Sequence, residues 1–179
     1  VKNRYFCRHE DGSDFIAAVW PGDTHFPDVL NDEARAWFGD KYRFLTDQGI
    51  EGFWNDMNEP AIFYSPEGIN EVKEMLKHFL ENEDYNSGIN AGTLAVAPTS
   101  DTNDSGETDN ADWTSVWPLM GKINGLANSK EDYRRFYHMV NGKPIRHDKV
   151  HNLFGYNMTR AAGEAFERID PGKRFLMFS

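Results

Sequence analysis

Two short apolar runs and the helix between them constrain the fold of this chain more than any other feature. Residues 50–54, which read Ile-Glu-Gly-Phe-Trp, predict a short β-strand, and Phe175–Phe178 predict a second strand. Apolar side chains at helical spacing predict a helix that Pro171 stops. They are Leu153, Tyr156, Ala161, Ala162, Ala165, Phe166 and Ile169. Strands joined through a helix pair in parallel, so the sequence predicts an α/β fold, with the second strand buried on both faces.

The first half of the chain predicts one further strand and one helix. The apolar run at 15–19 leads into the turn residues Trp20-Pro21-Gly22-Asp23, as a strand does. Asn31 is a typical N-cap residue, and the glycine at position 49 is a typical helix end. We therefore expect one helix over 31–49. Its apolar face is expected to consist of Ala34, Trp37, Phe38, Phe44 and Leu45.

Residues 61–150 are too many for an ordinary strand-to-helix loop, so they predict an insertion that is partly helical. One helix is expected to carry an apolar stripe, and a second is expected to start at Ser129, with Asp132 imitating a capping box, and to end at Gly142. The stripes are Ile69, Val72, Met75, Leu76, Phe79 and Leu80, and then Tyr133, Phe136, Tyr137 and Val140. Residues 85–112 contain no Lys or Arg and predict a mobile loop.

The overall charge argues against two classes of partner. Nineteen Lys and Arg against 29 Asp and Glu give a net charge of −10, which repels nucleic acids and anionic membranes. No apolar run in the sequence has the length of a membrane span, and the single Cys7 excludes an internal disulfide framework. A lone cysteine weakly favours the cytoplasm. We expect no nucleic acid partner, no membrane partner and no cofactor.

The segment Trp54–Pro60, which reads Trp-Asn-Asp-Met-Asn-Glu-Pro, carries the densest set of chemical groups. It follows a predicted strand directly, where α/β folds place their active sites. Hydrolysis or transfer at a sugar acetal needs one carboxylate to stabilise or trap the anomeric carbon and another to protonate the leaving oxygen. The amides of Asn55 and Asn58 can hold an ionised carboxylate, and the tryptophan can pack on a sugar ring. From chemistry alone Asp56 and Glu59 are both candidates, and an Asx-rich turn is the alternative.

Two metal sites are possible alternatives. Residues 101–112 have carboxylates and amides at the spacing of a calcium-binding loop, but Asp112 is shorter than the glutamate that usually closes such a loop. His147 and His151 are four residues apart, which would place two imidazoles on one helical face for zinc. No third ligand is evident, so we predict no metal. The Trp113 and Trp117 pair could contact an oligosaccharide or pack inside the insertion.

The segment Trp54–Pro60 resembles the signature of glycoside hydrolase family 31, the α-glucosidase and α-xylosidase family. Three other stretches resemble the family in register: 18–28, with Ala-Val-Trp-Pro-Gly and Phe-Pro-Asp, 151–156, with His-Asn-Leu-Phe-Gly-Tyr, and 174–179, with Arg-Phe-Leu-Met-Phe-Ser. The resemblance implies that Asp56 is the catalytic nucleophile of a retaining α-glycosidase. It also implies that Trp20 and Met57 line the pocket for an α-glucoside or oligosaccharide substrate, and that Glu59 supports the site by hydrogen bonding.

The resemblance further implies part of a (β/α)8 TIM barrel around its fourth and fifth strands. Residues 1–60 would be the barrel segment ending at the nucleophile strand, 61–150 the insertion, and 151–179 the next helix and strand. The chain opens at Val1 and stops after an apolar run, so we expect an internal piece of a longer protein. In the family the acid/base Asp lies two strands beyond the nucleophile, so the rest of the barrel would supply it, and the 179 residues alone are expected to be inactive. An α-xylosidase, a transglycosidase, an α-glucan lyase or a non-catalytic calcium- or sugar-binding module are the alternatives.

Overall fold

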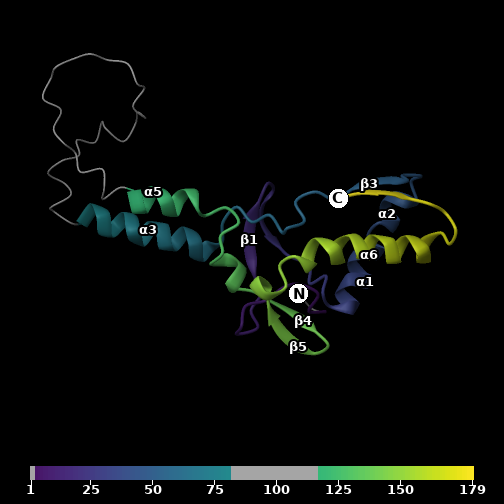
Figure 1. Ribbon diagram of the computed structural model, residues 1–179, viewed down its shortest axis with the longest axis horizontal. Coiled ribbons are helices and arrows are strands. Elements are labelled where there is room, and N and C mark those ends of the chain that lie inside the picture. The colour runs from purple at the N-terminus through teal and green to yellow at the C-terminus, as the bar shows by residue number, and fades with distance from the viewer. Residues whose placement is uncertain (1–2, 82–116) are drawn as a thin grey trace, which may run out of the picture. The chain divides into compact units, whose positions relative to one another are not determined.

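The computed structural model describes residues 3–81 and 117–179 (Figure 1). The chain forms two compact units, residues 1–68 with 126–179 and residues 69–125. The calcium-type loop, Trp113 and the whole of the predicted mobile loop lie outside the described residues. The described elements are β1 (Ile16–Val19), β2 (Gly22–His25), α1 (Asp32–Asp40), α2 (Arg43–Thr46), β3 (Gly52–Trp54), α3 (Pro66–Glu81), α5 (Trp117–Asn124), η3 (Asp132–Arg134), β4 (Tyr137–Val140), β5 (Lys143–Arg146), η4 (His147–Lys149), α6 (Leu153–Ile169) and β6 (Leu176–Phe178). None of the described helices is long and apolar enough to span a bilayer.

The predicted strand-helix-strand unit is confirmed in the first unit. Strands β3 and β6 pair in parallel, with Phe53 opposite Met177, and the ladder ends where the Asn55 N–H donates to the carbonyl of Phe178 at 2.8 Å. The two strands run side by side in Figure 1, with α6 connecting back to β6. The prediction that β6 is buried on both faces is wrong for the described residues. The side chain of Leu176 is 71% exposed, because a sheet of two strands leaves one face uncovered.

The predicted helix over 31–49 starts where expected, but the prediction of one continuous helix is wrong. The side chain of Asn31 caps α1 by accepting from the Ala34 N–H at 3.0 Å. At the end of α1 the backbone tightens, because the N–H of Tyr42 donates to the Gly39 carbonyl, three residues back, and a short second helix α2 follows. The tightened turn changes the direction of the apolar stripe, and Phe44 is left 75% exposed.

Helices α1 and α6 approach each other closely through small side chains. A Cβ atom on Gly39 would lie 2.3 Å from the carbonyl oxygen of Ala161 and 3.0 Å from the Cβ of Ala165. Both alanines are buried. A glycine is therefore required at position 39 by the approach of a backbone, and this contact holds α1 against α6.

The predicted helix from Ser129 to Gly142 is wrong beyond its first turn. The Ser129 hydroxyl does accept from the Asp132 N–H at 3.0 Å, but the helical part is only the short turn η3. Strands β4 and β5 follow as an antiparallel hairpin. Its two turn residues, Asn141 and Gly142, both have positive φ, at 51° and 75°. Asn-Gly is the favoured pair for the two-residue turn that joins twisted antiparallel strands, so turn chemistry prevails over the helical spacing.

The core of the first unit is built from aromatic rings contributed by distant segments. The rings of Phe15 and Phe136 stack with their centroids 4.4 Å apart, and both side chains are fully inaccessible to solvent. Phe15 precedes β1 and Phe136 precedes β4, so this contact joins the N-terminal strands to the β4–β5 hairpin. The buried members of this cluster are Cys7, Phe15, Ala17, Phe26, Ile62 and Phe136.

The second unit contains most of α3 and all of α5. Helix α3 is confirmed over the predicted stripe, and Lys122 of α5 forms an ion pair with Glu71 of α3 at 2.6 Å. Helix α3 starts in the first unit, where Ser65 acts as its cap. The Ser65 hydroxyl accepts from the Gly68 N–H at 3.0 Å and donates to Asp132 Oδ1 at 2.5 Å. The base of α3 is thereby attached to η3.

Candidate active site

The segment that follows β3 leaves the sheet at Asn55 and exposes a carboxylate. Asp56 is exposed, and its Oδ1 accepts from the backbone N–H of Met57 at 2.9 Å. Met57 has a φ of 58°, in the left-handed region that side chains other than glycine rarely adopt. Strained backbone of this kind concentrates at functional sites because the surrounding structure must hold it. The predicted place of Asp56, at the carboxyl end of a parallel strand, is confirmed.

Asn55 does not play the part that its neighbourhood in the sequence suggests. Asn55 is buried whereas Asp56 is exposed, and Asn55 Oδ1 accepts from the hydroxyl of Tyr42 at 2.5 Å. Its Nδ2 has no hydrogen-bond partner among the described residues. The expectation that this amide holds the ionised carboxylate is therefore wrong.

The rest of the segment contacts α6 at Asn58 and lies near η3 at Glu59. Asn58 donates from Nδ2 to the Ser179 hydroxyl at 2.5 Å, and its carbonyl oxygen lies where a Cβ on Gly155 would be only 2.9 Å away. Glu59 is exposed. Burial raises the pKa of the half-buried Tyr133 hydroxyl, and the negative charges of Glu59 and Asp132 raise it further. Glu59 therefore lies close enough to Tyr133 for the two to interact electrostatically.

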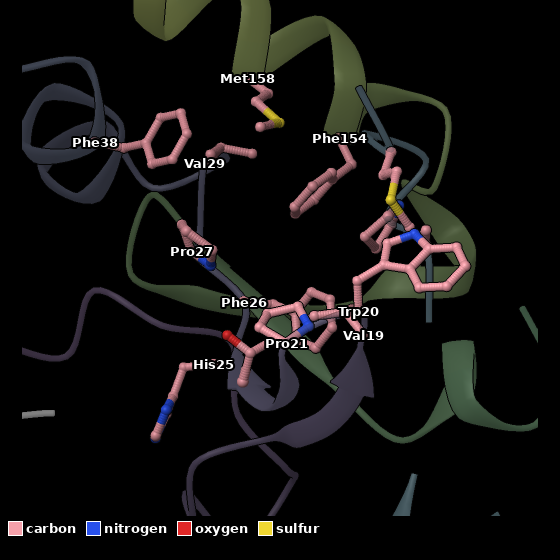
Figure 2. Close-up of a pocket in the computed structure, with 14 residues that line it drawn as sticks. Val19, Trp20, Pro21, His25, Phe26, Pro27, Val29, Phe38, Phe154 and Met158 are labelled. Atoms are coloured by element: carbon pink, nitrogen blue, oxygen red, sulfur yellow. The ribbon is translucent and has the colours of Figure 1, made fainter. Parts of the chain in front are cut away.

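A pocket of about 240 Å³ brings together the two predicted substrate-binding residues, Trp20 and Met57. Trp20 is 79% exposed and packs edge-on against Phe63, with centroids 4.9 Å apart. Figure 2 shows Phe154 and Met158 of α6 entering the pocket from the top of the view, with the Trp20 ring at its right. The other lining residues are Val19, Pro21, Thr24, His25, Phe26, Pro27, Val29, Phe38, Pro60 and Ala61. The wall is mainly apolar, and the Asp56 side chain is not part of it.

A buried chain of three polar side chains lies between the N-terminal segment and the β4–β5 hairpin. Asp28 Oδ1 accepts from His138 Nδ1 at 2.7 Å, and His138 Nε2 lies 2.9 Å from His147 Nδ1. Since a carboxylate only accepts, Nδ1 of His138 carries a proton and donates it to Asp28. Burial, and to a smaller extent the neighbouring His138 and His151, lower the pKa of His147 to about 3. The sequence reveals no sign of this network, because its members are far apart along the chain.

The same region holds the one group of described residues whose ligand atoms are close enough together to suggest a metal ion. Ligand atoms of Cys7, Asp28 and His138 lie within 4.8 Å of one another. However, two atoms bound to one tetrahedral zinc ion are about 3.3 Å apart. The 2.7 Å between Asp28 and His138 is a hydrogen-bond distance. Burial and the charge of Asp28 raise the pKa of the Cys7 thiol, which opposes thiolate formation. The distance between Asp28 and His138 therefore indicates a hydrogen bond and not two ligands of one metal ion.

The alternative in which His147 and His151 share one helical face is not found. His147 begins the short turn η4, which ends at Lys149, so the two residues do not share a helix. His147 uses Nδ1 for the bond to His138, and His151 Nδ1 lies 3.0 Å from the side-chain oxygen of Asn152. The two rings are 5.2 Å apart between centroids. Each of these imidazoles is oriented by a hydrogen bond through its Nδ1.

The buried His147 predicts a loss of stability in acid. The folded state holds the ring neutral down to a pH of about 3, whereas an unfolded chain protonates histidine near pH 6.5. Stability is therefore retained above pH 6.5 and falls as the pH is lowered toward 3, by at most about 1.4 kcal/mol per pH unit. We expect His147→Gln to make the unfolding temperature of the native protein less dependent on pH between 6.5 and 4. An unchanged pH dependence in this variant would show that His147 is protonated in the fold.

The fold and this site together define a class: a parallel α/β segment with an exposed carboxylate at the carboxyl end of a strand. The sequence matches the model of the glycosyl hydrolases family 31 TIM-barrel domain over residues 1–179. The chain therefore belongs to glycosyl hydrolase family 31, and its parallel β3–β6 pair is part of a TIM-barrel domain.

Individual proteins with sequences similar to this chain include alpha-glucosidases. The chain is 47% identical to alpha-glucosidase 2 of Bacillus thermoamyloliquefaciens over 75 residues, which are 42% of this chain and 9% of the relative. It is 38% identical to the lysosomal alpha-glucosidase of Bos taurus over 98 residues, 54% of this chain and 10% of the relative. The aligned part of the chain thus spans about a tenth of the length of these curated relatives.

Among solved structures, a family 31 dextranase of Flavobacterium johnsoniae, complexed with glucose, superposes with a TM-score of 0.54 at 17% identity, over 98% of this chain and 14% of that chain. The alpha subunit of glucosidase II, bound to alpha3-Glc2, superposes with a TM-score of 0.50 at 19% identity, over 99% of this chain and 13% of that chain. Both likenesses concern the fold.

Proposed function

We propose that this chain is the nucleophile-bearing segment of a retaining α-glycosidase, most specifically an α-glucosidase, with Asp56 as the nucleophile. One observation carries the proposal: Asp56 is an exposed carboxylate at the carboxyl end of a parallel strand in a family 31 barrel domain. In barrels of this type, catalytic groups occupy that end of the strands. The relatives of known name, an alpha-glucosidase 2 and a lysosomal alpha-glucosidase, support the choice of substrate.

The reaction would proceed by double displacement. The Asp56 carboxylate attacks the anomeric carbon, the glycosidic C–O bond breaks, and the leaving oxygen takes a proton from an acid. A water molecule, deprotonated by the same acid/base group, then attacks the glycosyl ester and releases the sugar and the Asp56 carboxylate. The acid/base carboxyl would lie about 5 Å from Asp56, as retaining chemistry requires, and would come from another barrel strand.

The neighbours of Asp56 would bind and orient the sugar. Trp20 presents an exposed ring beside Met57, and apolar faces of sugar rings pack on aromatic rings. Glu59, which lies near Tyr133, would support the site by hydrogen bonding and by its negative charge. In the whole barrel β3 and β6 would be the fourth and fifth strands, residues 61–150 the insertion between them, and 151–179 the following helix and strand.

The substrate class is an α-glucoside or α-gluco-oligosaccharide, and no step of this mechanism requires a cofactor. An α-xylosidase is the alternative within the same chemistry. The substrates of these two enzymes differ only in the hydroxymethyl group at C5 of the sugar. The ratio of kcat/KM for an aryl α-glucoside to that for an aryl α-xyloside therefore distinguishes the two enzymes. Transglycosidases and α-glucan lyases would be recognised by their products, a new oligosaccharide or an unsaturated sugar.

The stereochemistry of the product tests the proposal. The native protein in which this sequence occurs is incubated with an aryl α-glucoside, and the anomeric protons are followed by NMR from the first minutes. We expect α-glucose to appear first and β-glucose only by later mutarotation. Initial release of β-glucose, or no release from any α-glycoside, would contradict the proposal. A polypeptide of residues 1–179 alone is expected to release no sugar, because it would contain only one member of the carboxyl pair.

A further inference from the structure

The tightened turn between α1 and α2 places one side chain against the strand that carries Asp56. The ring of Tyr42 packs edge-on against Phe53 of β3 and Phe166 of α6, with centroids 5.2 and 5.4 Å away. Its hydroxyl donates to Asn55 Oδ1 at 2.5 Å. Burial raises the pKa of this hydroxyl, so it stays a donor over the working range of an enzyme. Tyr42 is thus fixed between two elements, with its hydroxyl on the residue before Asp56.

Asn55 is held from both its backbone and its side chain. Its N–H continues the β3–β6 ladder to Phe178, and its buried side chain meets Tyr42. The next residue has no such support, because Asp56 is exposed and its one hydrogen bond within the described residues comes from the neighbouring Met57 N–H. Any rotation of the Asn55 peptide would therefore be passed on directly to the Asp56 side chain.

We infer that Tyr42 is a positioning residue, whose hydroxyl fixes the direction of the Asp56 carboxylate through Asn55. The inference rests on the proposed function, since it assigns a purpose to a bond behind the proposed nucleophile. Nucleophilic attack requires the carboxylate oxygen within about 3 to 3.5 Å of the anomeric carbon and in line with the leaving group, so small displacements are costly to the rate. A bond on the buried face of the strand adjusts this geometry without contacting the substrate.

The experiment measures the first chemical step alone. The native protein is treated with 5-fluoro-α-glucosyl fluoride, in which the Asp56 carboxylate forms a bond to C1 as the C1–F bond breaks and fluoride leaves without a proton from the acid. The trapping rate per labelled site is determined as a function of reagent concentration. The variants are Tyr42→Phe, Asn55→Ala and the double variant, and Tyr64→Phe, an exposed tyrosine of the same unit, is the matched control.

We expect Tyr42→Phe to lower the saturating trapping rate by about tenfold or more, because misplacement of the nucleophile lowers the rate steeply. The half-saturating concentration and the pH at which the rate declines in acid are expected to stay unchanged, and Tyr64→Phe is expected to trap as the native protein does. In the Asn55→Ala background, Tyr42→Phe should have no further effect, since the hydroxyl acts through Asn55.

Three results separate the possible failures. An unchanged saturating rate per site in Tyr42→Phe would overturn the inference while leaving Asp56 as the nucleophile. A further loss in the double variant, equal to the loss in the single variant, would show that the hydroxyl does not act through Asn55. The absence of any adduct on Asp56 in the native protein would instead contradict the proposed function. If Tyr42→Phe does not fold, Asn55→Ala tests the same bond from its other partner.

Discussion

Asp56→Ala is expected to lower kcat of the native protein by about 10⁴-fold or more, because removing a catalytic nucleophile leaves only binding and the remaining electrostatic groups. Asp56 is exposed and takes no part in the core, so the unfolding temperature is expected to stay within the range of ordinary surface substitutions. Initial rates with an aryl α-glucoside and thermal unfolding measure the two quantities.

The matched comparison is Glu59→Gln, which removes the other carboxylate of the same segment. Because Glu59 is proposed to support the site from its position near Tyr133, its loss is expected to cost about 10² in kcat and leave a measurable activity. The opposite ranking, with Glu59→Gln inactive and Asp56→Ala active, would mean that Glu59 is the nucleophile.

Gly39→Ala is expected to destabilise the fold by about 2 to 3 kcal/mol, at the upper end of overpacking substitutions. The new Cβ would lie 2.3 Å from the carbonyl oxygen of Ala161, and a backbone atom in a helix cannot move away as a side chain can. Helices α1 and α6 must therefore separate. Equilibrium denaturation of the native protein measures the loss.

Gly163→Ala, on the same helix α6, is the matched control. A Cβ at this position has no neighbour within 4 Å, so the substitution adds a methyl group without a clash. Alanine in a helix interior is favoured over glycine, and a gain of about 0.5 to 1 kcal/mol is expected. If both substitutions changed stability alike, the close approach at position 39 would not be the cause.

Local patterns in the sequence predict the elements whose stability is decided locally. The Asn31 cap, the stripe of α3 and the span of α6 all follow from spacing and capping, and the structure confirms them. The stripe from Tyr133 to Val140 is the instructive failure. It has helical spacing, but the Asn141-Gly142 turn fixes a hairpin, and the hairpin buries His138 and covers Phe136. In so short a segment, turn residues predict the secondary structure better than apolar spacing does.

The candidate site, like the fold, is predictable from the sequence only where local patterns decide its structure. The place of Asp56 follows from a polar run directly after an apolar strand, and this pattern is visible in the local sequence. The contacts behind it do not follow, because Tyr42 and Gly155 are distant in the sequence and reach the segment only through the packing of α1 and α6. One signal was available: period-two alternation predicts that Asn55 and Asp56 point to opposite faces.

The most direct measurement of the central claim is the site of covalent trapping. The native protein is incubated with 5-fluoro-α-glucosyl fluoride, digested, and mapped by peptide mass spectrometry, with Asp56→Ala as the control. The account predicts one fluoroglucosyl ester, on Asp56, formed at the rate of inactivation and absent from the variant. An adduct on Glu59 or on another residue, or inactivation of Asp56→Ala at the native rate, would contradict it.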